Sequence, residues 1–138
     1  MPHLTVLAFD YGVKNIGVAY GQSLTGSAKE LPPLSARDGV PNWQQVKSLL
    51  DEWQPQQLLV GLPLNMDDSE SELCVRARKF ANRLNGRFGL PVELFDERLS
   101  TRMAKEEARE RGHHGHYASA PIDSIAARLI LESWFVSQ

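Results

Sequence analysis

Acidic residues occupy three positions from which they could act together on one ligand. Asp10 and the pair Asp96-Glu97 each end an apolar run, and Asp123 lies at the start of an amphipathic pattern near the C-terminus. A carboxylate that closes a buried strand is costly to desolvate unless a cation or hydrogen-bond donors meet it. Oxygen ligands of this kind favour Mg²⁺ or Mn²⁺. Two such ions held together promote phosphodiester hydrolysis.

Geometry limits which of these carboxylates can meet. Neighbouring residues of a strand point to opposite faces of the sheet, so only one member of the Asp96-Glu97 pair is expected to join Asp10. Two alanines follow Asp123 at the i+3 and i+4 positions, on a helix face that must approach the sheet closely. A carboxylate on that face is out of place unless it coordinates something. The sequence therefore favours a shared metal site.

Each acidic position also has a simpler explanation. Asp10 could form a turn by accepting local backbone hydrogen bonds. Asp123 at a helix start interacts favourably with the helix dipole. Asp96 could form an exposed ion pair with Arg98, which would contribute little energy. The metal site is the stronger hypothesis because all three positions are expected at one edge of a sheet.

The chain pattern predicts the elements that would position these residues. Apolar runs predict strands over 4–10, 15–21, 25–36 (weak, and ending around Pro32-Pro33), 58–62 and 92–95. Amphipathic spacing predicts helices over 43–53 after an Asn42 cap, over 73–84 with Gly86 as terminator, over about 101–111, and from about 121. An opening meander followed by strand–helix alternation is typical of an α/β fold, here a mixed five-stranded sheet with helices on both faces. Ligands bind such sheets at the carboxyl ends of parallel strands.

Bulk composition limits the protein class. A chain of 138 residues suits a single domain spanning 1–138. The formal net charge of −2 argues against a generic polybasic coat for nucleic acid but allows a local basic groove. Cys74 is the only cysteine, which excludes an internal disulfide and a cysteine metal cluster. Neither a signal peptide nor a membrane-spanning stretch is recognisable, so a cytoplasmic protein without membrane contact is expected.

Five stretches of the chain, in order and over nearly its whole length, match one family. They are Phe9-Asp-Tyr-Gly-Val-Lys-Asn-Ile-Gly-Val-Ala19, Val60-Gly-Leu-Pro-Leu-Asn-Met-Asp67, Ala77-Arg-Lys-Phe-Ala-Asn-Arg83, Asp96-Glu-Arg-Leu-Ser-Thr101, and Ile122-Asp-Ser-Ile-Ala-Ala127 with Ile130-Leu-Glu-Ser133. In these stretches the chain resembles the YqgF/RuvX family of RuvC-like nucleases, which have the ribonuclease H-like fold.

The resemblance implies a metal-dependent nuclease that hydrolyses phosphodiester bonds. Asp10, Glu97 and Asp123 would be its catalytic residues and its ligands for Mg²⁺ or Mn²⁺, with Glu97 favoured over Asp96. Processing of the 5′ end of pre-16S rRNA in ribosome biogenesis is the favoured role. The alternatives are a Holliday junction resolvase acting on branched DNA and a non-catalytic nucleic-acid-binding module. A monomer or a weak homodimer is expected, and cleavage specificity stays open.

Another hypothesis starts from the Asp-x-Gly turn after the first strand. This turn also resembles the phosphate hairpin of the actin and sugar-kinase fold. That fold needs two lobes to enclose a nucleotide, and this chain has room for one. A nuclease therefore remains the better interpretation.

Several basic and polar residues are candidates for substrate contacts. Three of them, Lys14, Asn65 and Arg98, could each bind a phosphate. The simpler alternatives are that Lys14 is a solvated turn residue, that Asn65 caps a helix and that Arg98 forms an ion pair with Asp96. The helix over 73–84 and its C-terminal flank carry a basic run, which would be a solvated face or a track for a nucleic-acid backbone. Its members are Arg76, Arg78, Lys79, Arg83 and Arg87.

The segment 112–120 is glycine- and histidine-rich and is expected to be a mobile loop. Its histidines, His113, His114 and His116, fit a zinc site poorly because no cysteine accompanies them. A pH-dependent phosphate contact is the better functional hypothesis, and a loop without function is the simplest.

Overall fold

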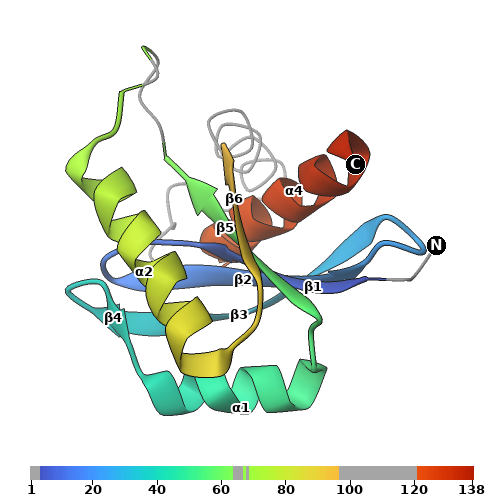
Figure 1. Ribbon diagram of the computed structural model, residues 1–138, viewed down its shortest axis with the longest axis horizontal. Helices are drawn as coiled ribbons and strands as arrows, with labels where there is room; N and C mark the ends of the chain where they lie inside the picture. The colour runs from blue at the N-terminus through green and yellow to red at the C-terminus, as the bar shows by residue number, and fades with distance from the viewer. Residues whose placement is uncertain (1–3, 64–66, 68, 97–120) are drawn as a thin grey trace.

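One mixed sheet forms the centre of the molecule (Figure 1). The computed structural model describes residues 4–63, 67, 69–96 and 121–138, with the backbone but not the side chains of 121–123. The sheet has the strand order β4-β3-β2-β1-β5-β6. Its strands are β1 (Thr5–Asp10), β2 (Asn15–Gln22), β3 (Ser27–Arg37), β4 (Val40–Pro41), β5 (Gln57–Leu62) and β6 (Val92–Asp96). Strands β1 to β4 pair antiparallel in succession, whereas β5 lies parallel to both β1 and β6.

Among the described residues, the sheet therefore has six strands in place of the five predicted from the sequence. The additional strand β4 has two residues and pairs antiparallel with the end of β3 after a tight turn at Asp38 and Gly39. A strand this short contains no apolar run from which the sequence could predict it. Strand β3 also continues past the prolines where it was predicted to end, because Pro32 and Pro33 lie at a register shift between β2 and β3. A missing backbone N–H costs little at such an irregularity.

In the part of the chain that the structure describes, two helices cover one face of the sheet and one covers the other face (Figure 1). Helices α1 (Trp43–Trp53) and α2 (Glu72–Phe88) pack on one face, and α4 (Pro121–Ser137) packs on the opposite face. The apolar face predicted for α1 lies in this core, and its residues are Trp43, Val46, Leu49, Leu50 and Trp53. The Asn42 cap is confirmed, since its side chain accepts hydrogen bonds from the amides of Gln44 and Gln45.

Helix α2 continues beyond its predicted end. Gly86 is a helical residue, and the helix ends at Gly89, which has a φ of +70° and whose amide bonds to the Asn85 carbonyl. A side chain at Gly86 would meet nothing within 4 Å, so this glycine reflects no steric demand. The left-handed conformation that favours glycine occurs only after the helix has closed its last turn.

Some predictions fall outside the described residues. The helix predicted over about 101–111, the loop predicted over 112–120 and its three histidines belong to this group. The last predicted helix is confirmed as α4, which begins at Pro121. Among the described residues, no helix is long and apolar enough to cross a membrane.

Candidate active site

Asp10 is the last residue of β1, a central strand of the sheet. It lies opposite Gly17 of β2 and is partly exposed. Val6 and Ala8 pack in the core under α4, whereas Leu7 and Phe9 pack in the core under α1 and α2. Because side chains alternate along a strand, Asp10 belongs to the face that α4 covers.

Asp96 ends β6 and belongs to the opposite face. It pairs with Leu62, which lies in the core under α1 and α2, and residues in register on parallel strands share a face. The alternation agrees, since Phe95 packs in the α4 core and Leu94 packs in the other core. Asp10 and Asp96 are therefore separated by the sheet. Glu97 lies outside the described residues.

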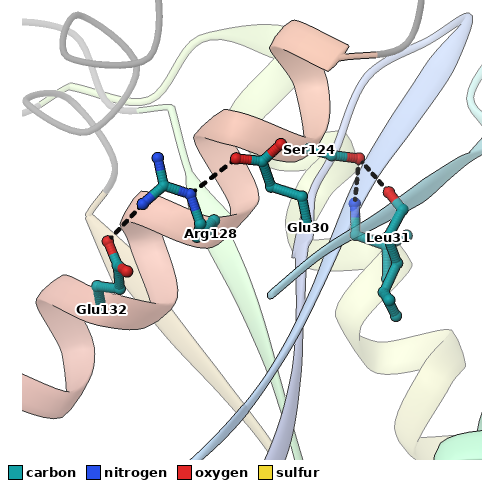
Figure 2. A network of polar contacts seen from close by, with 6 residues as sticks. Glu30, Leu31, Ser124, Arg128 and Glu132 are labelled. Atoms are coloured by element: carbon teal, nitrogen blue, oxygen red, sulfur yellow. Dashed lines mark hydrogen bonds and ion pairs between the residues drawn. The ribbon is translucent and has the colours of Figure 1, made fainter. Parts of the chain in front are cut away.

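The start of α4 is held on the sheet by a buried hydroxyl. Asp123 lies in the first turn of this helix, and Ser124 follows it with an exposed fraction of 3%. The Ser124 Oγ donates to the Leu31 carbonyl at 2.5 Å and accepts from the Val18 amide at 3.4 Å (Figure 2). These contacts fall at the register shift between β2 and β3, where strand pairing is interrupted. One serine thus ties the turn that carries Asp123 to two strands.

A second polar contact holds α4 one turn further along. The Arg128 Nε donates to Glu30 of β3 at 2.8 Å, and its Nη1 donates to Glu132 at 2.9 Å (Figure 2). The Arg128 side chain is 16% exposed, so water screens this pair less than a surface pair. Near the other end of α4, the Trp134 indole donates to Glu93 of β6. Helix α4 is therefore bonded to strands on both sides of β1.

The turn between β1 and β2 carries Lys14, which is exposed. The Tyr11 hydroxyl donates to the buried Gly39 carbonyl at 2.9 Å, and the Gly39 amide donates to the Val13 carbonyl at 2.8 Å. Gly39 has a φ of +81°, and a Cβ there would lie 2.0 Å from the Tyr11 hydroxyl. Only glycine tolerates both this positive φ and the close approach of the Tyr11 hydroxyl. The turn after Asp10 is thus held by the turn before β4.

Arg76 of helix α2 also holds the turn at Asp38 and Gly39. Its Nη2 donates to the Asp38 carbonyl at 2.5 Å and to the Asp38 carboxylate at 3.1 Å. The hydrogen bond to the Asp38 side chain raises the pKa of Arg76 above its ordinary value, so the guanidinium stays charged. Asp38 itself has a φ of +50°, a conformation that such a contact helps to hold.

The structure describes only part of the predicted site. Asn65, Glu97 and Arg98 lie outside the described residues, as does the side chain of Asp123. Accordingly, no group of three His, Cys, Asp or Glu side chains that could hold a metal ion occurs within the described part. Asp10 fits a hard divalent cation, because it offers carboxylate oxygen at a strand end on the face of the helix that carries Asp123.

Three residues that shape this region were not recognised as functional in the sequence. They are Ser124, Tyr11 and Gly39, and the role of each depends on a partner that lies far away in the chain. A polar residue in the apolar pattern of the last helix was the one available signal for Ser124. Nothing in the sequence indicated that Gly39 and Tyr11 meet.

The chain is similar to a known family of proteins. A family model described as "RuvX: Holliday junction resolvase" matches residues 4–137. A protein of Saccharophagus degradans is 61% identical over 98% of this chain and 95% of its own length. One of Chromohalobacter salexigens is 63% identical over 94% of this chain and 88% of its own. Both carry the name "Putative pre-16S rRNA nuclease".

Solved structures of distant sequence share the fold. The RuvC protein of T. thermophilus, solved in complex with a Holliday junction substrate, aligns with a TM-score of 0.59 at 20% identity. The alignment covers 97% of this chain and 94% of that one. The Holliday junction resolvase of fowlpox virus aligns with a TM-score of 0.57 at 16% identity, covering 97% and 99% of the two chains. The ribonuclease H-like α/β fold predicted from the sequence is thereby confirmed.

Proposed function

Because this chain belongs to the RuvX family, we propose that it is a nuclease whose active centre lies at the sheet edge marked by Asp10. The observation that carries this proposal is the shared face of Asp10 and α4, together with the buried hydroxyl that fixes the first turn of α4. A carboxylate at the end of a central strand and a second one on that helix turn would approach one substrate phosphate from the same side.

We assign Asp10, Glu97 and Asp123 as the catalytic residues and as the ligands of Mg²⁺ or Mn²⁺. The position of Asp96 on the face opposite Asp10 supports the choice of Glu97, since only one member of the Asp96-Glu97 pair is expected to join Asp10. The bound metal would polarise the phosphoryl oxygens and activate the attacking water. The three carboxylates would bind and orient it, and their mutual repulsion would be relieved by its charge.

Other residues of this chain would hold the substrate. Lys14 is exposed in the turn after Asp10, where the Tyr11–Gly39 contact fixes the backbone, and its ammonium can meet a phosphate as a point charge. In the sequence, Asn65 comes shortly after Leu62, the last residue of β5, and Arg98 follows Glu97. An arginine in this place can bind a phosphate through two parallel hydrogen bonds.

The proposed substrate is the 5′ region of precursor 16S rRNA, from which we infer that the protein acts in the cytoplasm. Relatives at 61% and 63% identity carry the name "Putative pre-16S rRNA nuclease", which supports pre-16S rRNA as the substrate. Branched DNA is the second candidate, favoured by the description of the family model and by the fold shared with junction resolvases. Cutting two strands symmetrically would require a homodimer, whereas rRNA processing would be possible for a monomer.

The site assignment is tested by conservative substitutions. Asp10→Asn and Glu97→Gln should each reduce metal-dependent cleavage more than about 100-fold, because ligating oxygens are lost while shape is kept. Asp96→Asn is the matched control and should stay within a few fold of the wild type. Equal loss in Asp96→Asn and Glu97→Gln would refute the choice between them, and metal-independent cleavage by Asp10→Asn would refute the site.

The substrate is tested by direct competition. The wild-type protein with Mg²⁺ or Mn²⁺ would be incubated with a precursor-rRNA 5′ fragment and with a four-way DNA junction, while its solution mass is measured. Cleavage of the RNA at a unique position by a monomer supports rRNA processing. Paired symmetric cuts in the junction by a dimer would replace it with the resolvase function.

A further inference from the structure

Helix α2 carries four basic residues along one side, which we call the α2 basic stripe. Its members are Arg76, Lys79, Arg83 and Arg87. Their spacing of three, four and four residues keeps neighbours on the same side of a helix. The stripe lies beside the buried positions of the helix, on the flank that faces the Asp38 turn and α1. From Arg76 to Arg87 it extends about 16 Å, at about 1.5 Å per residue.

The charge of α2 is opposite to that of the molecule. The helix has five basic residues and one acidic residue, a formal charge of +4, whereas the whole chain has −2, so the remaining residues sum to −6. No Asp or Glu occurs between Leu73 and Phe88. Like charges four residues apart, such as Lys79 with Arg83, destabilise a helix. A face that only solubilises the protein usually mixes both signs, and this one does not.

The contacts of the stripe leave its centre open. Arg76 is bonded to Asp38, and the Arg87 guanidinium lies 4.3 Å from the ring centroid of Trp43. Lys79 and Arg83, between them, are exposed, and neither forms an ion pair with any residue in the described part of the chain. The ends of the stripe are therefore held in place, while the two central cations face solvent.

The stripe begins at the sheet edge where β1 ends at Asp10, although α2 covers the face of the sheet opposite to the Asp10 side chain. Strand β5 runs parallel to β1, so it ends at the same sheet edge as Asp10, and α2 then runs back along the sheet (Figure 1). Arg76 contacts the Asp38 turn, and the adjoining Gly39 holds the turn that carries Lys14. Cationic side chains thus continue from the site edge along α2.

We propose that the α2 basic stripe binds the sugar–phosphate backbone of the nucleic-acid substrate where it leaves the active centre, with Lys79 and Arg83 as the main contacts. This inference rests on the proposed function, since it needs a nucleic-acid substrate at the Asp10 edge. Backbone contact of this kind is independent of base sequence and depends strongly on salt, because each neutralised phosphate releases counterions.

The test is the double variant Lys79→Gln/Arg83→Gln, made both in the wild type and in Asp10→Asn. Binding of the precursor-rRNA 5′ fragment and of the four-way junction to the inactive pair is measured by fluorescence anisotropy over a range of salt. The double variant should raise Kd about tenfold at low salt. It should also reduce the slope of log K against log salt by about 1 to 2, as expected for two lost phosphate contacts. In the active background KM should rise while kcat stays unchanged.

Two controls separate the stripe from net charge and from packing. Lys29→Gln/Lys47→Gln removes the same charge from β3 and α1 and should change Kd less than twofold. The exchange Lys79→Arg/Arg83→Lys keeps the charge and should retain wild-type binding. The proposal for the stripe would be wrong if Kd and the salt slope were unchanged in Lys79→Gln/Arg83→Gln. It would also be wrong if Lys29→Gln/Lys47→Gln weakened binding to the same extent. Neither result would contradict the nuclease assignment. A wild-type protein that binds and cleaves neither nucleic acid would overturn both.

Discussion

The two faces of the sheet are held together by different kinds of interaction. On the α1 and α2 face the core is large and aromatic, and Phe80 contacts the rings of Phe9, Tyr11 and Trp43. On the α4 face a smaller apolar core is supplemented by hydrogen bonds from Ser124, Arg128 and Trp134 into the strands. Hydrophobic burial is non-directional, whereas a buried hydrogen bond is lost when its partners shift. The helix on the face that carries Asp10 is therefore positioned by directional contacts in addition to apolar packing.

The largest stability change is expected on the aromatic face. Phe80→Ala removes a side chain that is 3% exposed and should lower the free energy of unfolding by about 3–5 kcal/mol. Denaturant unfolding measures this change. Cleavage per folded molecule should fall far less than in Asp10→Asn, because Phe80 contacts the rings of Phe9 and Tyr11 beside Asp10 but packs on the face of the sheet opposite α4. Val75→Ala, at an exposed position of the same helix, is the control. A large loss of cleavage in folded Phe80→Ala would show that both faces position the site.

A smaller stability change with a larger functional consequence is expected for Ser124→Ala. The substitution leaves the Leu31 carbonyl and the Val18 amide without their partner, at a cost of about 1–3 kcal/mol. Because the start of α4 is then less well fixed, the Mg²⁺ concentration needed for half-maximal cleavage should rise severalfold. Titration of cleavage rate with Mg²⁺ at a temperature where the variant is folded measures this effect.

Ser137→Ala, near the far end of α4, should leave the metal response unchanged, and Ser124→Thr should restore part of it by keeping the hydroxyl. If Ser124→Ala loses stability but keeps a wild-type metal response, the buried hydroxyl only stabilises the fold. The two faces of the sheet would then differ in how they stabilise the fold but not in how they position the active site.

Loss of the α1 cap should have a moderate effect confined to stability. Asn42→Ala removes the acceptor of the Gln44 amide at 2.9 Å and should cost about 1 kcal/mol. Thermal unfolding measures the cost, with Gln45→Ala as an exposed control on the same helix. Cleavage should not change. Altered KM or kcat in this variant would contradict the separation of α1 from the active centre.

The smallest effect is expected from the ion pair at the start of α2. Arg78 donates to Glu70 at 2.7 Å and lowers the pKa of that carboxyl through the hydrogen bond. A carboxyl whose pKa is lower in the folded state stabilises the protein above its ordinary pKa, and this contribution is lost as pH falls through the lowered pKa. Both groups are largely solvated, so the effect should be slight.

The acid side of the unfolding profile measures this pair. Arg78→Gln should flatten the decrease of stability below the ordinary pKa of glutamate and leave stability near neutral pH almost unchanged. A steeper acid decrease in the variant would have the wrong sign for this pair.

Predictability from sequence differed between elements of the fold. The buried run that forms β1 and the amphipathic spacing of α1 and α4 were recognisable, because local periodicity reports which side of an element is buried. The predicted end of α2 was wrong by a few residues, since Gly86 and Gly89 lie close together and only Gly89 adopts a left-handed conformation. Strand β4 was missed because two residues carry no periodicity.

For the candidate site, the local pattern of the chain was enough to predict that Asp10 and Asp96 end apolar runs and that Asp123 lies at the start of a helix. The faces of the sheet on which Asp10 and Asp96 lie follow only from the folded chain, because they depend on strand register and on the core in which each neighbouring residue packs. Asp10 faces α4 and Asp96 does not, although both close a strand in the same way. The hydroxyl of Ser124 likewise found its partners 93 and 106 residues away, at a distance along the chain that no local pattern reports.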